Sequence, residues 1–137
     1  MILKDTGPLV ALFDPADSDH KRCAKLLASI EEPLCTTVPV LTEAFHLLTP
    51  GSTGSQRLMD FVTEHGLQVW FLDDSALVRA FELMIRYADH PMDLADASLV
   101  VLAETLKLRK VFTIDRNDFS SYRIKQGHRH FPFEVLS

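Results

Sequence analysis

The sequence has few of the residues that build disulfide frameworks, metal fingers or membrane spans. Its two cysteines, Cys23 and Cys35, are too few and too poorly spaced for a disulfide framework or a structural zinc site. We expect both to be small buried residues of a protein that works in the reducing cytoplasm. No apolar run approaches the roughly 18 residues that a membrane-spanning helix needs. Residues 1–5 lack the basic start and long apolar stretch of a signal peptide, so we expect a cytoplasmic protein without membrane contact.

Length and composition are those of an ordinary globular protein. The chain has 137 residues, of which 47% are hydrophobic and 24% charged, so it is neither disordered nor fibrous. A chain of this size can bury a proper core and still form one domain. We therefore expect a single domain over residues 1–137, without internal repeats.

Positive charge is scarce overall but is concentrated at one end. The net charge of −5 argues at first against a nucleic-acid partner. Residues 107–137, however, carry seven Lys and Arg against three acids, a net charge of +4, whereas residues 1–106 carry −9. A local basic patch can hold a polyanion even on an acidic protein. A solvated basic tail that keeps the fold soluble explains the pattern equally well.

Short apolar runs alternate with helical patterns along the chain. The runs predict strands at 2–4, 34–37, 67–72, 111–114 and 133–136. The intervening patterns predict helices at 8–13, 18–30, 38–48, 55–65, 73–87 and 93–106, and a turn at 115–119. This alternation is typical of an α/β sandwich around a mostly parallel sheet, here with five strands.

Two carboxylates, Asp93 and Asp96, stand three residues apart where the 93–106 helix begins. This spacing puts both on one face of the helix. Acids at a helix start often only cap free N–H groups, so this pattern alone favours capping and a functional role about equally.

Other isolated acids favour the functional interpretation. Asp5 follows the first predicted strand and Asp115 follows the fourth. In parallel sheets ligands bind beyond the carboxyl ends of the strands, at the switch point in strand order. If strands one and four are neighbours, Asp5, Asp115 and the start of the 93–106 helix share one crevice. Glu43, one turn into the helix after the second strand, can reach the same place, although a surface glutamate is the commoner explanation.

Four short pieces, taken in order, resemble the motifs of a known family. They are Asp5-Thr6-Gly7-Pro8-Leu9, Thr42-Glu43, Asp93-Leu94-Ala95-Asp96-Ala97 and Thr113-Ile114-Asp115-Arg116-Asn117-Asp118-Phe119. Together they are similar to the PIN-domain ribonucleases found as toxins of bacterial VapBC toxin–antitoxin pairs. Each piece is weak singly, but the order and spacing of all four are specific, and the resemblance spans nearly the whole chain.

The resemblance implies a PIN-like three-layer α/β/α sandwich and a role for each matching residue. The implied metal-binding and catalytic acids are Asp5, Glu43, Asp96 and Asp115, with Asp93 or Asp118 auxiliary. Thr6 and Thr113 become hydroxyls that support the acids or a substrate phosphate. The resemblance also implies an RNA substrate, a homodimer, and a protein antitoxin that blocks the crevice. We expect exposed apolar groups on helices 18–30 and 38–48 to hold that antitoxin.

The chemistry of the acids agrees with this resemblance. Four converging carboxylates without cationic partners raise one another's pKa values. A divalent cation resolves the conflict, and hard oxygen ligands suit Mg²⁺ or Mn²⁺, whereas no histidine has zinc-like spacing. Such a site activates water for phosphodiester hydrolysis, which predicts a divalent-metal-dependent endoribonuclease. Arg116 is a candidate for holding a phosphate, although an exposed loop arginine is commoner.

Two other functions stay open at this point. One is an inactive PIN-like binding module, which the full set of acids disfavours. The other is a receiver-like phosphoacceptor domain, which needs an acidic pair after the first strand and a lysine after the last. Here only Asp5 follows the first strand, and the chain ends at Ser137 without that lysine.

Overall fold

The first strand, β1 (Ile2–Lys4), lies at the centre of the sheet and is buried along its whole length. In the computed structural model, which describes residues 1–137, the sheet has five strands in the order β3-β2-β1-β4-β7. Every neighbouring pair is parallel, so all five strands end at the same edge. The other four strands are β2 (Leu34–Thr37), β3 (Gln68–Trp70), β4 (Lys110–Phe112) and β7 (Glu134–Leu136). The predicted five-stranded, mostly parallel sheet is confirmed.

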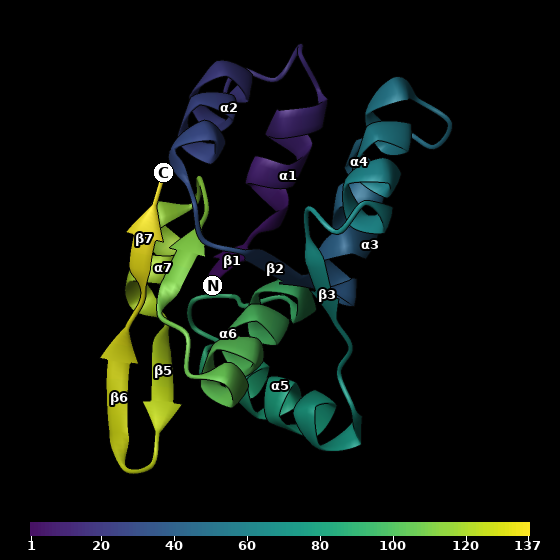
Figure 1. The fold of residues 1–137 in the computed structure, drawn as a ribbon. Helices are drawn as coiled ribbons and strands as arrows, with labels where there is room; N and C mark the ends of the chain where they lie inside the picture. The colour runs from purple at the N-terminus through teal and green to yellow at the C-terminus, as the bar shows by residue number, and fades with distance from the viewer.

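Helices connect the strands and cover both faces of the sheet. The first four lie on one side of the strands, and α5 and α6 lie on the other (Figure 1). Right-handed crossovers produce this separation, because the chain runs from β1 to β3 in one direction and then returns to β4 beyond β1. The three-layer α/β/α sandwich is therefore confirmed. The helices are α1 (Thr6–Phe13), α2 (His20–Ser29), α3 (Val38–Leu47), α4 (Thr53–Thr63), α5 (Asp74–Arg86), α6 (Leu94–Leu106) and α7 (Arg116–Ser121).

The strand order reverses between β1 and β4, which makes this the switch point of the sheet. Leu3 pairs with Val111 and Lys4 with Phe112, so the two strands end side by side. The expectation that the first and fourth strands are neighbours is confirmed, and whatever follows each strand meets at one crevice.

The helix α6 is apolar on all sides, and residues 97–103 are all buried. The one polar residue in this run, Ser98, donates to Ala95 O at 2.7 Å and shares a 2.5 Å hydrogen bond with Thr37 Oγ1. Thr37 also caps α3 by accepting from Val40 N at 3.4 Å. These bonds fix the starts of α3 and α6 relative to the end of β2.

One cation, Lys4, lies wholly inside the molecule. Its Nζ has no hydrogen-bond partner and lies 3.9 Å from the centroid of the Phe112 ring, which offsets part of the cost of burial. Burial lowers the pKa of Lys4 to about 7. Because successive strand side chains point to opposite faces, Lys4 is directed away from the neighbouring Asp5 and does not neutralise it.

Both cysteines, Cys23 and Cys35, are buried and unbridged, as expected for small core residues. None of the helices has the length and apolar character needed to cross a membrane.

Exposed apolar side chains are distributed differently from the expectation for helices 18–30 and 38–48. On α2, Leu26 and Leu27 are half-buried, and this helix carries no large exposed hydrophobic residue. On α3, Leu47 is exposed as expected. The expectation is therefore wrong for α2, because its apolar stripe packs onto the core. The other large exposed apolar residues are Met59, Phe71, Val78, Phe81, Ile85 and Leu106.

Two elements near the C-terminus differ from the sequence expectation. The predicted turn at 115–119 is the short helix α7. The basic segment, for which a polyanion-binding patch and a solvated tail were equally open, forms an antiparallel hairpin of β5 (Arg123–Gln126) and β6 (Arg129–Pro132), for which no strands were predicted. Gly127 supplies the left-handed turn between these strands, at a φ of 64°. The hairpin was not predicted because its strands are mostly charged or polar, and only Ile124 is fully buried.

Candidate active site

Asp5 follows β1 and caps α1 at the switch point of the sheet. Its Oδ1 accepts from Thr6 N at 2.8 Å and its Oδ2 accepts from Thr113 Oγ1 at 2.7 Å. Burial raises the pKa of Asp5 to about 6, because the loss of water outweighs both hydrogen bonds, and the charges of Glu43 and Asp93 raise it further. Asp5 is therefore mostly ionised at pH 7 without a cation beside it, which is costly for a buried carboxylate.

Asp93 and Asp96 take different roles at the start of α6. Asp93 is the capping residue, and its Oδ1 accepts from Asp96 N at 2.8 Å. Asp96 caps nothing, and its Oδ2 accepts from Tyr122 OH at 3.0 Å. Burial raises the pKa of Asp96 to about 8, and the charges of Asp5 and Asp93 add to the rise. The capping explanation therefore fits Asp93 but not Asp96.

Glu43 reaches the same crevice from α3, where it is half-buried. Its pKa is raised first by burial and then by the charge of Asp93. The Thr6 hydroxyl offsets part of this rise, although Thr6 Oγ1 is buried without a full hydrogen bond. Glu43 lies close to the sheet edge because α3 begins directly after β2, with Thr37 as its cap and Pro39 in its first turn.

The segment after β4 contributes a hydroxyl and a capping acid. Thr113 Oγ1, which donates to Asp5, also accepts from Asp115 N at 3.0 Å. Asp115 caps α7 by accepting from Asp118 N at 3.2 Å, and its side chain is exposed. The pKa of Asp115 is raised chiefly by its contact with the Asp118 carboxyl. Thr113 thus joins the two strand-end acids through one oxygen.

The other residues of this segment lie at the margin of the crevice. Asp118 is the acid of this turn whose charge helps to raise the pKa of Asp96. Its Oδ1 also lies 2.6 Å from His90 Nε2. Arg116 is directed elsewhere, since its Nε donates to Ser137 Oγ at 2.6 Å. The structure therefore brings together Asp5, Glu43, Asp93 and Asp96, with Asp118 beside them, Asp115 joined through Thr113, and Arg116 outside.

Sequence reasoning missed Tyr122 and His90, which bind two of the acids. Tyr122 is fully buried, and its ring meets those of Tyr87 and Phe119 edge-on, with centroids 5.3 and 5.2 Å away. This packing aims the phenol at Asp96 across 26 residues of sequence. No motif spacing could reveal a contact that depends on the folding of β5 and α7 against α6.

Two of the acids, Glu43 and Asp93, line a crevice of about 590 Å³ between α3 and the start of α6, and Asp5 and Asp96 lie outside its lining. No three acidic, histidine or cysteine side chains stand close enough to enclose a metal ion as they are. The donor chemistry nevertheless fits a hard divalent cation, because the groups gathered here are oxygen donors: carboxylates near enough to raise one another's pKa values, and the buried Thr6 hydroxyl, which lacks a full partner. The crevice is lined by Val38, Pro39, Thr42, Glu43, His46, Asp93, Leu94 and Ala95.

A parallel sandwich with buried carboxylates at its switch point defines an α/β protein with an acidic crevice. The PIN domain family matches residues 2–125, and the chain belongs to this family. The family resemblance of the four motifs is thereby confirmed. Ribonuclease VapC26 of Mycobacterium tuberculosis is 29% identical over 128 residues, which cover 91% of this chain and 94% of that protein.

Solved structures share the fold at lower sequence identity. VapC20 of Mycobacterium tuberculosis, described as a sarcin–ricin loop cleaving toxin, has a TM-score of 0.79 at 20% identity and covers 85% of this chain and 92% of its own. A toxin–antitoxin complex from Klebsiella pneumoniae has a TM-score of 0.68 at 17% identity, covering 88% and 92%. FitAB bound to a DNA fragment has a TM-score of 0.62 at 18% identity, covering 87% and 88%. At these identities the matches support the fold alone.

Asp96→Asn tests whether Asp96 carries a strained charge. A carboxyl whose pKa rises from 3.8 to about 8 binds extra protons in the folded state, so metal-free stability falls as pH rises between these values. In thermal melts in EDTA at pH 8, we expect the asparagine variant to be more stable than the parent, with a free energy of unfolding higher by at least about 1 kcal/mol. Millimolar Mn²⁺ should reverse the order, because the metal binds only the parent.

The matched control is Asp73→Asn, since Asp73 caps α5 through an ordinary bond to Ala76 N. Its pKa is lowered by that bond, so the variant should be equal to or weaker than the parent, with no response to metal. An Asp96→Asn variant that is less stable than the parent in EDTA would contradict the assignment of Asp96.

Proposed function

We propose that this chain is a divalent-metal-dependent endoribonuclease and the toxin of a type II toxin–antitoxin pair. The observation that carries the proposal is the burial of Asp5 beside Asp96, with both pKa values raised, at the switch point of a PIN domain. The 29% sequence identity to Ribonuclease VapC26 over 128 residues supports ribonuclease activity in particular. An inactive binding module would have no reason to keep two such acids buried and unpaired with cations.

Mg²⁺ or Mn²⁺ bound beside these acids would supply positive charge for the phosphate oxygens. It would also lower the pKa of a bound water molecule toward neutral pH, so that the water could act as a nucleophile. Asp5 and Asp96 are the first ligands that we assign, and Glu43 and Asp115 follow. Asp93 is an auxiliary ligand that also fixes the start of α6.

The neighbouring hydroxyls keep the acids oriented. Thr113 and the Thr6 backbone hold the two oxygens of Asp5, and Tyr122 holds one oxygen of Asp96. These bonds leave each carboxyl little rotational freedom, which reduces the cost of forming an ordered site. Asp118 lies within one turn of Asp115, where we assign it to the support of the site. Arg116 would have to release its bond to Ser137 Oγ before it could contact a substrate phosphate.

The substrate is single-stranded or loop RNA. Unstacked nucleotides can be splayed into a crevice, whereas the grooves of an A-form helix keep the backbone from entering one. The crevice between α3 and α6 can accommodate a single RNA strand lying past the acids, with Thr42 and His46 lining its α3 side.

Loss of either buried acid should abolish cleavage without loss of the fold. We expect Asp5→Asn and Asp96→Asn to lower the rate of RNA cleavage in Mn²⁺ by several orders of magnitude, because each removes a ligand from the ion that stabilises the transition state. Labelled loop RNA, incubated with and without Mn²⁺ and resolved on a gel, measures this rate.

Asp73→Asn serves as the control here too, because Asp73 follows β3 at the same sheet edge but does not act on Asp5 or Asp96. It should cleave like the parent. Undiminished cleavage in EDTA, or by either site variant, would refute a metal mechanism. A parent without any cleavage would favour the inactive binding module.

The partner that we propose is a protein antitoxin that covers the crevice. Its positive side chain would reach the acids, since an uncompensated acidic pocket attracts one. The exposed Leu47 at the end of α3 offers it an apolar contact. We further propose a homodimer, for which the exposed stripe of Val78, Phe81 and Ile85 along α5 provides a candidate surface.

Expression in bacteria tests the toxin assignment. The chain alone should arrest growth, and Asp96→Asn should remove the arrest because it removes cleavage while the fold persists. Colony counts after induction, with protein levels matched by immunoblot, give the readout. Arrest of equal strength by the variant and the parent would count against a toxin that acts through this site.

A further inference from the structure

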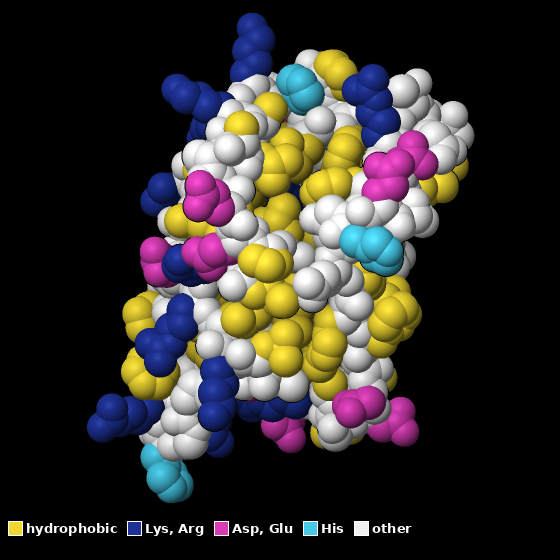
Figure 2. Space-filling view, viewed as in Figure 1, with side chains coloured by type: hydrophobic (Ala, Val, Ile, Leu, Met, Phe, Trp, Pro, Cys, Tyr) yellow, Lys and Arg dark blue, Asp and Glu magenta, His cyan; other side chains and the backbone are white.

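The hairpin of β5 and β6 carries the most basic segment of the chain. Residues 119–132 contain three Lys or Arg and two His, but no acid. Figure 2 displays this concentration as dark blue side chains over the region that the hairpin occupies in Figure 1, with a histidine at its tip. We call residues 123–132 the basic arm. Lys107 and Arg109 stand beside it at the end of α6.

These cations have no carboxylate partners. None of the five, namely Lys107, Arg109, Arg123, Lys125 and Arg129, lies within ion-pair distance of a carboxylate. All five are exposed. Arg109 stacks 3.5 Å from the centroid of the Phe131 ring, and its guanidinium makes no hydrogen bond. The guanidinium of Arg123 donates from Nη1 to Ser120 O at 2.7 Å and to Tyr122 O at 2.9 Å, and these carbonyls carry no net charge. No carboxylate therefore neutralises the five positive charges, which can act on an anionic ligand from solution.

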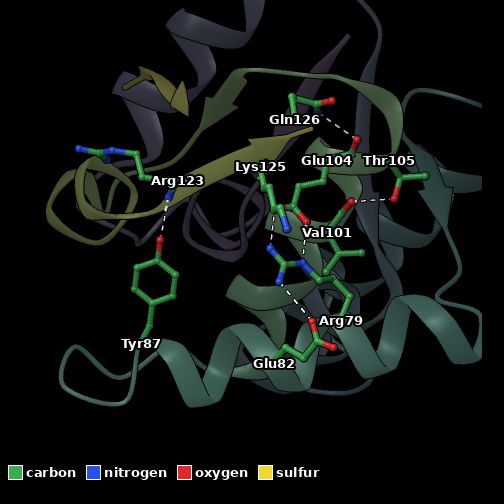
Figure 3. A network of polar contacts seen from close by, with 9 residues as sticks. All are labelled: Arg79, Glu82, Tyr87, Val101, Glu104, Thr105, Arg123, Lys125 and Gln126. Carbon is green, nitrogen blue, oxygen red and sulfur yellow. Dashed lines mark hydrogen bonds and ion pairs between the residues drawn. The ribbon is translucent and has the colours of Figure 1, made fainter. Parts of the chain in front are cut away.

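The carboxylate that contacts the backbone of the arm is already engaged. Glu104 accepts from Arg79 Nε at 2.9 Å and Nη2 at 3.1 Å, and also from the backbone N of Lys125 at 2.9 Å (Figure 3). Gln126 Nε2 adds a bond to Glu104 O at 3.0 Å. Glu104 therefore anchors the backbone of the arm, while the ammonium group of Lys125 is left without a counterion.

The arm is firmly attached and begins beside the acids. Ile124 is fully buried, and Arg123 N donates to Tyr87 OH at 3.0 Å. Tyr122, which precedes the arm, donates to Asp96. Tyr122 contacts α6 at Asp96, and the Lys125 backbone contacts the same helix at Glu104. These two positions are eight residues apart on α6, a distance along the helix of about 12 Å at the rise of ~1.5 Å per residue.

We propose that the basic arm binds the sugar–phosphate backbone of the RNA substrate, away from the bond that is cut. This inference rests on the proposed function and adds the surface that recruits the substrate. A separation of about 12 Å is longer than one nucleotide step, which is ~3.4 Å along the axis even in a stacked strand, so the arm meets phosphates other than the one at the acids. The arm has no large exposed apolar side chain, so its chemistry suits a polyanion rather than a lipid interior or an apolar protein groove.

The test is RNA binding in EDTA, where cleavage is absent. A fluorescein-labelled RNA stem–loop is titrated with protein at 50 to 200 mM salt and followed by anisotropy. The double variant Lys125→Gln/Arg129→Gln keeps the anchor, because Glu104 binds the Lys125 backbone and not its side chain. We expect it to bind about tenfold more weakly, with a salt slope lower by roughly 0.7 to 0.9 for each cation removed.

The control is Lys21→Gln/Lys25→Gln, which removes the same charge from exposed positions on α2, at the far end of the molecule (Figure 1). It should bind with the affinity and salt slope of the parent. Unchanged binding by the arm variant, or equal weakening by the control, overturns the inference.

The outcomes also separate this inference from the proposed function. A parent that cleaves RNA in Mn²⁺, with an arm variant that binds as the parent does, refutes the arm alone. A parent that binds RNA through the arm but cleaves nothing in Mn²⁺ refutes the nuclease and leaves the arm supported.

Discussion

The burial of two like-charged carboxyls at one edge of a parallel sheet is the constraint on which this structure depends. Asp5 and Asp96 lose water, which raises the pKa of both. The charge of Asp5 raises the pKa of Asp96 further, and the charges of Glu43 and Asp93 raise that of Asp5. The fold compensates only in part, through the N-terminal ends of α1 and α6 and through hydroxyls from Thr113 and Tyr122. The divalent cation that we propose would relieve the remaining strain, so the stability of the site and its chemistry would have the same physical origin.

The central layers were predictable because their signal is local. Buried strands such as β1 and β2 are short apolar runs, and α6 is apolar on every side, so composition alone indicates them. The nearness of Asp5 and Glu43 was predictable because parallel strands bring the residues that follow them to one edge, and Asp96 was expected there from its place at a helix start, whereas the roles of these acids stay predictions. The pairing of Tyr122 with Asp96 and the whole basic arm were not, since both depend on contacts between distant segments. Local sequence also left open which acid caps α6, and only the fold separates Asp93 from Asp96.

In the function that we propose, the acidic crevice and the basic arm have complementary roles. An acidic crevice attracts a cation, and a basic arm about 12 Å away attracts the phosphates that the cation acts on. The net charge of −5 therefore does not describe either surface. Tyr122 and Glu104 connect the two, the first through Asp96 and the second through the backbone of Lys125. The β5–β6 hairpin, which sequence composition did not reveal, is thus attached to α6, the helix that begins with Asp93 and Asp96.

Calorimetric titration with Mn²⁺ at pH 7, in buffers of different ionisation enthalpy, tests the central claim most directly. Carboxyls with pKa values of about 8 and about 6 must lose their protons to bind a metal, so binding should release about one proton per ion, nearly all of it from Asp96. Asp96→Asn should bind far more weakly and release almost none. The account is contradicted if the parent binds no Mn²⁺, or if it binds without proton release and with an affinity that Asp96→Asn leaves unchanged.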